Sequence, residues 1–196
     1  MRWIFKAISV LALAALTLSG TAVPAHAKQE RPEYTVVSTE GDVEIRDYET
    51  MVLAQFTMRG SYRQSVSQGY MKLEQYFLGK NSVPEPIAMT VPTMVRDDLA
   101  GGWATMFYMG KRYRADTAPR PHDSRIRVIE FPPRRIAAIV FPGKLNDDVM
   151  REQVEKLEEW LAAHGIAHAA DFTLAGYDAP WVPASRRHNE VLVTLK

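Results

Sequence analysis

Runs in which apolar and polar residues alternate, the pattern typical of half-buried β-strands, occur repeatedly in the first part of the chain. They predict five strands, at residues 34–37, 43–48, 51–58, 87–95 and 103–109. The first three are rich in Val, Ile, Tyr and Phe, and only the turn-like segments Glu40-Gly41-Asp42 and Glu49-Thr50 separate them. Such short connections predict that these three strands form an antiparallel meander.

A helical pattern replaces the alternation between the third and fourth strands. Apolar or small residues recur there every three or four positions, at Tyr62, Val66, Gly69, Leu73 and Tyr76. Ser61 has the short polar side chain that caps helix N-termini, and Gly79 suits the backbone turn that ends a helix. We therefore predict a helix over residues 61–78 with one stripe facing the core.

The second half of the chain repeats this order of elements. Four more strands are predicted, at 126–131, 135–141, 172–177 and 190–195. A helix over 147–163 separates the second of these strands from the third. Asn146 can cap this helix, and Gly165 can end it. Apart from the first strand, at 34–37, the two halves thus share the plan strand-strand-helix-strand-strand.

The halves also match residue by residue when the chain is shifted against itself by 83 positions. Tyr48 then meets Phe131, and Gly60 meets Gly143. A chance register of strands explains apolar matches, whereas an internal duplication also explains the aromatic and glycine matches. Each unit is too short to bury a sheet alone. We predict one α+β domain over residues 28–196, in which duplicated units form a distorted antiparallel β-barrel flanked by two helices.

Residues 1–27 have the composition of a cleaved signal peptide. Arg2 and Lys6 provide a basic start, and an apolar run of twelve residues follows at Ala7–Leu18. Ala25-His26-Ala27 then presents small residues where a signal peptidase cuts. The alternative is a membrane anchor, but the run is shorter than the roughly 20 residues that span a bilayer. We expect cleavage after Ala27, export to the periplasm or the medium, and no membrane span in the remaining chain.

Charge and cysteine content limit the classes of partner that we expect for residues 28–196. This part of the chain has 22 Lys or Arg against 23 Asp or Glu, a formal charge of −1. Such a balance gives no global basic field, so nucleic acid is not an expected partner. The chain has no cysteine, so its core has to stabilise the exported protein without disulfides. We expect a soluble monomer.

Common catalytic and metal-binding motifs are missing from the sequence. It has no cysteine nucleophile, no Gly-x-Ser-x-Gly elbow, no phosphate-binding glycine loop and no His-Glu-x-x-His. His164 and His168 have the spacing of a helical metal pair, but Gly165 lies between them where the helix should end. That position favours a surface loop. We predict no catalytic residue and no metal site.

A second stripe runs along the helix predicted over 61–78. Its members are Ser67, Tyr70, Met71, Glu74 and Leu78. The stripe is too apolar for a face turned entirely to water. Tyr70, Met71 and Leu78 either widen the contact with the core or form one wall of a ligand cleft. A flexible methionine and a flat tyrosine ring suit a broad aromatic ligand.

Five short motifs follow one another along the chain. They are Val43-Glu44-Ile45-Arg46-Asp47-Tyr48, residues 72–81 (KLEQYFLGKN), residues 87–92 (IAMTVP), Tyr177-Asp178-Ala179-Pro180-Trp181, and Arg186-Arg187 with Asn189-Glu190-Val191. In this order they resemble the motifs of the SOUL haem-binding protein family, over about residues 34–195. The resemblance implies a duplicated α+β fold that binds haem or a related tetrapyrrole. It places the ligand in a shallow hydrophobic cleft between the first helix and the Tyr-Asp-x-Pro loop.

The resemblance also implies a set of ligand-binding residues on these two segments. They are Ser67, Tyr70, Met71, Glu74, Trp181, Val182, Arg186 and Arg187. Family members that ligate iron through a histidine have it at the position of Asp47, and a carboxylate is a poor haem ligand. We therefore expect no axial histidine at that position.

Other family members pair the propionates with basic residues on the first helix and the loop. Ser67, Gln75 and Val182 occupy those positions here, so these cations are missing. Lys72 or one of the two loop arginines, Arg186 and Arg187, can replace them as charge-assisted donors. The same three residues can equally be ordinary surface cations.

Two functions from different classes are consistent with these residues. The first is an exported binding protein for haem, a related tetrapyrrole or another flat hydrophobic small molecule. The second is a hydrolase-like enzyme that processes a small molecule, with Glu74 as acid or base once Tyr70 and Trp181 bury it. We expect the binding protein rather than the enzyme. A buried Glu74 facing the same cleft as Trp181 would favour the enzyme.

Overall fold

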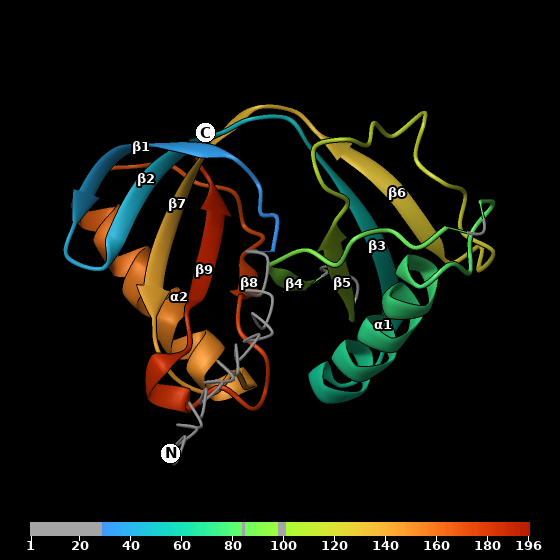
Figure 1. Ribbon diagram of the computed structural model, residues 1–196. Coiled ribbons are helices and arrows are strands. Elements are labelled where there is room, and N and C mark those ends of the chain that lie inside the picture. The colour runs from blue at the N-terminus through green and yellow to red at the C-terminus, as the bar shows by residue number, and fades with distance from the viewer. Residues whose placement is uncertain (1–28, 84, 98–100) are drawn as a thin grey trace, which may run out of the picture.

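The computed structural model describes residues 29–83, 85–97 and 101–196, and the predicted signal peptide lies outside these ranges. In the described part, nine strands and two α-helices follow the predicted order (Figure 1). The strands are β1 Tyr34–Glu40, β2 Val43–Tyr48, β3 Met51–Arg59, β4 Thr93–Asp97, β5 Gly102–Tyr108, β6 Ile126–Phe131, β7 Arg134–Phe141, β8 Thr173–Gly176 and β9 Asn189–Thr194. The helices are α1 Tyr62–Phe77 and α2 Asp147–Ala163, and a 3₁₀ turn, η1, spans Ala184–Arg186.

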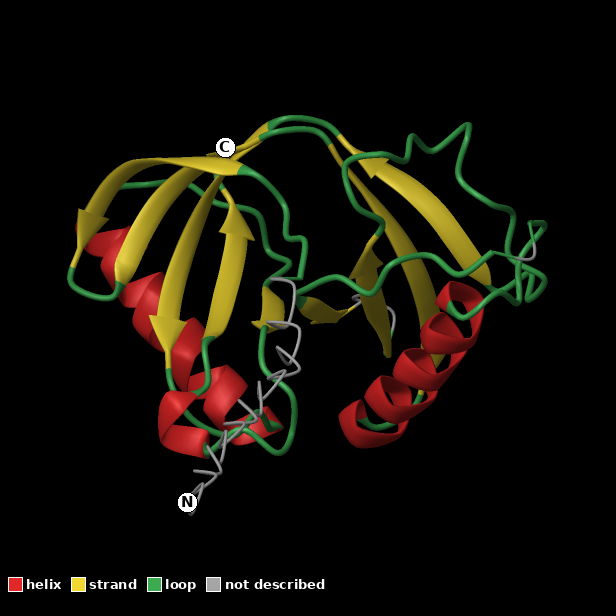
Figure 2. Cartoon of the chain, viewed as in Figure 1, coloured by secondary structure: helices red, strands yellow, loops and turns green. Residues whose placement is uncertain are grey.

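All nine strands belong to one curled antiparallel sheet with the order β1-β2-β7-β9-β8-β4-β5-β3-β6. The sheet has two halves (Figure 2), and they meet where β4 pairs with β8. α2 packs on β7 and β9 in one half, and α1 packs on β3 and β5 in the other. This arrangement confirms the predicted α+β fold, a distorted and incompletely closed barrel flanked by two helices.

The predicted meander of the first three strands is only half right. β1 and β2 form a hairpin in which Tyr34 lies opposite Tyr48. β2 then pairs with β7, however, and β3 pairs with β5 and β6. The chain therefore crosses from one half to the other between β2 and β3, and crosses back between β6 and β7 (Figure 1). A local pattern predicts a strand but not which distant strand lies beside it.

The two halves of the sequence exchange one strand each, β2 and β6. Adding 83 to the bounds of β2 gives the bounds of β6. β2 pairs with β7 of the second half, and β6 pairs in the same way with β3 of the first half. Both halves thus have the same strand plan, and the common origin of the halves stays a prediction.

Both helices begin at the predicted caps. The Ser61 side chain accepts a hydrogen bond from the backbone N–H of Gln64 at 3.4 Å. Asn146 accepts one from the backbone N–H of Val149 at 2.9 Å. Gly79 follows α1 with φ at +107°, in the region that favours glycine. Neither helix in the described ranges is long and apolar enough to cross a membrane.

The core stripe of α1 lies against β5 largely as predicted. Gly69, Leu73 and Tyr76 are buried, whereas Tyr62 is partly exposed. A Cβ atom added to Gly69 would lie 2.3 Å from the hydroxyl oxygen of Thr105 on β5. The glycine therefore allows the helix to approach the sheet closely.

β4 is shorter than the strand predicted over residues 87–95. The N–H of Ile87 donates to the carbonyl of Phe77 at the end of α1 at 2.7 Å, and the N–H of Val91 donates to the carbonyl of Glu30 at 2.9 Å. Pro92 has no N–H to offer a neighbouring strand. Residues 87–92 consequently bond to other segments, and pairing in the sheet begins only at residue 93.

Candidate functional site

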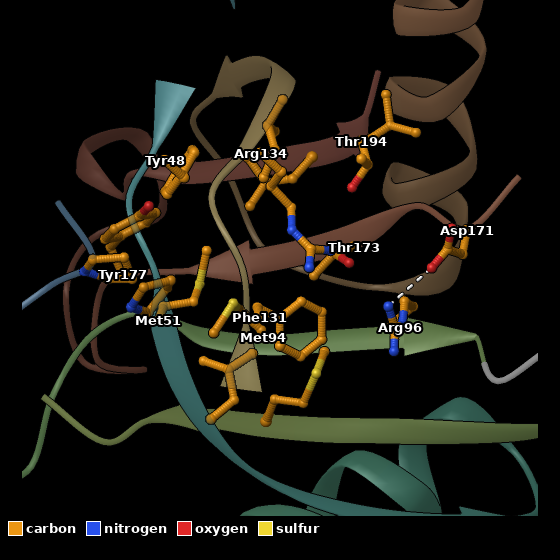
Figure 3. Close-up of a pocket in the computed structure, with 17 residues that line it drawn as sticks. Tyr48, Met51, Met94, Arg96, Phe131, Arg134, Asp171, Thr173, Tyr177 and Thr194 are labelled. Atoms are coloured by element: carbon orange, nitrogen blue, oxygen red, sulfur yellow. Dashed lines mark hydrogen bonds and ion pairs between the residues drawn. The ribbon is translucent and has the colours of Figure 1, made fainter. Parts of the chain in front are cut away.

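The curled sheet surrounds a groove on its inner face, between its two halves (Figure 3). Its 17 lining residues come from every strand except β1 and from the adjoining loops. The cavity between them has a volume of about 60 Å³ and opens to solvent. We call this space the inner groove.

Apolar side chains form the floor of the inner groove. Leu53, Met94 and Met106 are only 2, 5 and 2% exposed. Met51 and Phe131 lie beside Met94 in Figure 3. Three methionines in one groove give a deformable lining, because the unbranched thioether side chain adapts to the shape of a ligand.

Three charged side chains line the inner groove: Arg96 on β4, Arg134 on β7 and Asp171 just before β8. Arg96 donates a hydrogen bond to Asp171 at 2.9 Å, which makes a half-exposed ion pair. The guanidinium of Arg134 lies 4.5 Å from the centre of the Phe131 ring, and its Nε donates to the carbonyl of Pro132 at 3.1 Å. Burial and, to a smaller extent, repulsion by Arg96 lower the pKa of Arg134.

Tyr48 and Tyr177 also line the inner groove, and both are bonded to a buried ion pair behind it. Arg46 donates from both terminal nitrogens to the Glu190 carboxylate, and the Tyr177 hydroxyl donates to the same group, all at 2.9 Å. A ring nitrogen of His188 lies 2.7 Å from the second oxygen of Glu190. Burial alone would raise the pKa of Glu190, but its hydrogen bonds to His188 and Arg46 lower the pKa overall. The Tyr177 hydroxyl therefore already donates its hydrogen bond within the protein.

α1 holds four of the eight predicted ligand-binding residues. Tyr70 and Met71 are each 40% exposed, Ser67 is exposed, and Glu74 is partly exposed. The Tyr70 ring packs edge-on against Phe107, with 5.2 Å between the ring centres, so one edge is anchored and the remainder is open. Because water reaches Glu74, the burial that would favour an enzyme is not present at this residue.

The loop between β8 and β9 holds the other four. Trp181 is 85% exposed, Val182 is half-buried, and Arg186 is exposed. Arg187 donates to the carbonyl of Val182 at 2.9 Å and to that of Pro180, so it stabilises the loop itself. Among the residues that the structure describes, no acid pairs with Arg186.

The predicted residues thus lie on two segments, in opposite halves of the molecule (Figure 1). None of the eight lines the inner groove. Lys72, the third candidate cation, pairs with Asp123 at 3.3 Å. Asp47 is exposed on β2 and accepts two hydrogen bonds from Arg135, at 2.7 and 2.8 Å. An arginine on the neighbouring strand therefore occupies both carboxylate oxygens.

The sequence analysis does not predict the inner groove, although the sequence carries a signal for it. Arg96 follows Met94 at a spacing of two on β4, and Arg134 precedes Ile136 at the same spacing on β7. Residues two apart in a strand share a face, so each arginine lies among inward-facing apolar residues. A charge in that register is only a weak signal of a site, because arginine is so often exposed. Its place in space depends on the pairing of strands that are distant in the chain.

The family model described as SOUL heme-binding protein matches residues 29–194 of this chain. None of the curated proteins matches it in sequence. The crystal structure of the EcmrR C-terminal domain is similar with a TM-score of 0.59 and 10% identity, covering 83% of this chain and 98% of that one. A crystal structure of a hydrolase from Listeria innocua has a TM-score of 0.50 and 12% identity, covering 87% and 94%. At these identities the two structures share the fold alone.

Proposed function

Because the chain belongs to the SOUL heme-binding protein family, we propose that it binds haem or a related tetrapyrrole. The proposed site consists of the exposed residues of α1 and of the loop between β8 and β9, which we call the α1–loop surface. Its residues are Ser67, Tyr70, Met71, Glu74, Trp181, Val182, Arg186 and Arg187.

The distribution of exposed apolar side chains is the observation that carries this proposal. Seven large apolar side chains are exposed in the part of the chain that the structure describes. Four of them, Tyr70, Met71, Leu78 and Trp181, lie on α1, at its C-terminal cap or on the loop. Apolar side chains that remain exposed mark interaction surfaces. Tyrosine and tryptophan rings offer flat faces on which a macrocycle can stack.

These residues fit a tetrapyrrole held by packing and by its carboxylates. Binding requires segments from opposite halves to contact the same macrocycle, Tyr70 and Met71 from α1 and Trp181 from the loop. Arg186 is exposed and has no acid partner in the described ranges, so it can pair with a propionate. Arg187 is less suited to that role, because it already donates to carbonyls of its own loop.

We further propose that the protein binds its ligand outside the cytoplasm, after removal of residues 1–27. The basic start, the short apolar run and the small residues at 25 and 27 support this proposal. A binding role rather than an enzymatic one is supported by the family description, which names a ligand and no reaction. The partial exposure of Glu74 also favours binding, because the burial on which the enzyme alternative depends is not present at this residue.

A haemin titration of residues 28–196, followed by Soret absorbance, tests the proposed function. We expect a saturable spectral change with one haemin per chain. Metal-free protoporphyrin IX should bind with similar affinity, because packing and propionate contacts do not require iron. The absence of saturable binding by either compound would contradict the proposal. Binding of haemin alone would show that an iron ligand, rather than the apolar surface, determines affinity.

A further inference from the structure

The inner groove is separate from the α1–loop surface. It is formed by the inner face of the sheet, whereas α1 packs on the outside of β3 and β5. None of the α1–loop residues lines the groove. A ligand of the inner groove therefore contacts a different set of residues from a tetrapyrrole on the α1–loop surface.

The inner groove is narrow at its base. Leu53, Met94 and Met106 have almost no contact with solvent. A broad macrocycle does not fit a cavity of about 60 Å³ above this floor. An alkyl chain is narrow enough to lie along the floor, where the methionines can adjust to its path. The shape of the groove thus favours a narrow ligand over a broad flat one.

Polar and apolar side chains are segregated along the inner groove (Figure 3). Tyr177 and Met51 lie towards one end, whereas Arg96, Asp171 and Thr194 lie towards the other. A ligand that follows the groove would therefore place an apolar part at one end and a polar part at the other. Such a distribution matches an amphipathic molecule.

The charges of the groove lining do not cancel. Arg96 and Asp171 form an ion pair at 2.9 Å, which leaves the charge of Arg134 without a carboxylate partner in the described ranges. The groove lining consequently has a formal charge of +1. Arginine does not lose its proton in proteins, so a half-buried guanidinium gains most from an anion.

We propose that the inner groove binds an aliphatic monocarboxylate, with the carboxylate paired to Arg134 and the alkyl chain along the methionine floor. A guanidinium can donate two parallel hydrogen bonds to one carboxylate. The hydroxyl groups of Thr173 and Thr194 also line this part of the groove and can donate to the same carboxylate. The single unpaired positive charge matches one negative charge on the ligand.

Three compounds with the same alkyl chain and different head groups test this proposal. Isothermal titration calorimetry of the full chain would compare octanoate, octan-1-ol and octylammonium. We expect the affinity for octanoate to exceed that for octan-1-ol by at least about tenfold, because the carboxylate of octanoate pairs with the Arg134 guanidinium. Octylammonium should bind more weakly than either. Equal affinities for all three, or a preference for octylammonium, would overturn the proposal.

Arg134→Gln and Arg135→Gln form a matched pair of variants. Both remove one positive charge from β7, but Arg135 pairs with Asp47 and does not line the groove. Arg134→Gln should weaken octanoate about tenfold and leave octan-1-ol unchanged, whereas Arg135→Gln should change neither. Thermal unfolding of both variants shows whether each is folded at the titration temperature. Equal losses of octanoate affinity in two folded variants would mean that overall charge, not Arg134, attracts the ligand.

Competition separates this site from the proposed tetrapyrrole site. If the two sites are distinct, saturating haemin leaves the octanoate affinity within about twofold, and Trp181→Ala weakens haemin alone. Mutually exclusive binding of haemin and octanoate would overturn the separate site while leaving tetrapyrrole binding intact. Failure of haemin to bind, with octanoate still bound, would contradict the proposed function and leave the inner groove supported.

Discussion

Arg46 of β2 and Glu190 of β9 form a bidentate ion pair inside the sheet, with two nitrogen–oxygen distances of 2.9 Å and both side chains 1% exposed. The two strands are not neighbours, because β7 lies between them. The guanidinium carbon of Arg46 also lies 4.3 Å from the centre of the Tyr34 ring on β1. This single pair therefore links three strands of one half and reaches the wall of the inner groove through Tyr177.

Removing one member of this pair should destabilise the protein strongly. Glu190→Gln and Arg46→Met should each lower the free energy of unfolding by about 3–5 kcal/mol. Arg46→Met leaves the Glu190 carboxylate buried without its arginine, and Glu190→Gln leaves the buried Arg46 guanidinium with only the partly exposed Glu44, at 2.7 Å, as a carboxylate partner. Urea unfolding at pH 7 measures the change. Arg151→Gln is the control, since it breaks an exposed pair with Asp148 and should have a much smaller effect. If all three variants lost similar amounts of unfolding free energy, the buried pair would not be more costly to break than the surface pair, and the prediction would be wrong.

The same carboxylate predicts how stability depends on pH. The pKa of Glu190 in the folded protein lies below its ordinary value of 4.5, so the unfolded chain binds more protons in acid. The contribution of Glu190 is fully present above about pH 5 and is lost as the pH falls through the folded pKa. Urea unfolding from pH 7 to pH 3 should show a steeper loss for the wild type than for Glu190→Gln. Parallel pH profiles would show that other carboxylates account for the acid dependence.

Tyr70→Ala and Trp181→Ala should each weaken haemin binding by about 1–3 kcal/mol, because each removes an exposed aromatic wall. Each change should weaken folding less than it weakens binding, since Trp181 is 85% and Tyr70 40% exposed. Leu73→Ala, which truncates a fully buried residue of the same helix, should instead cost about 2–5 kcal/mol of stability. Paired thermal unfolding and haemin titrations on the three variants make the comparison. If Tyr70→Ala and Trp181→Ala lost stability but kept their haemin affinity, the α1–loop surface would not be the haemin site.

Asp47→Ala should leave the Soret spectrum of the haemin complex unchanged. Asp47 is bonded to Arg135, and a carboxylate is a poor ligand for haem iron. Absorbance spectra of the wild type and the variant at saturating haemin test this prediction. Asp116→Ala, at another exposed carboxylate, controls for nonspecific effects of charge. A shifted Soret maximum in Asp47→Ala alone would point to iron ligation on β2.

Removal of residues 1–27 should yield a soluble protein that is monodisperse in size-exclusion chromatography with light scattering. The reason is that no later apolar segment approaches the roughly 20 residues needed to cross a bilayer. We expect the mass of a monomer. Persistent association of the shortened protein with membranes would contradict both the signal-peptide prediction and the absence of a later span.

The helices and most strands could be predicted because their signals are local. Ser61 and Asn146 cap the two helices within three residues of the groups that they bond. The neighbour of β2 could not be predicted in this way. Val43 lies opposite Ile139, and nothing in the intervening residues favours β7 over β3 as the partner.

The same limit applies to the charged residues. Arg46 has the period-two register of an inward-facing residue, but arginine is so often exposed that the pattern alone does not indicate burial. Its partner, Glu190, lies at the other end of the chain. The exposed stripe of Tyr70 and Met71 could be predicted because helical spacing within one element defines it. The eight predicted ligand-binding residues await a ligand experiment.

The exchange of β2 and β6 affects how the protein reaches its fold. While the first half is being synthesised, β2 lacks β7 and β3 lacks β6, so both strands present open edges that can pair with other chains. Closure brings together residues 70 to 96 positions apart, which is slow compared with forming a hairpin or a helix. Assembly of the curled sheet must therefore wait for the second half of the chain. Until then, newly made molecules are most exposed to aggregation and to proteolysis.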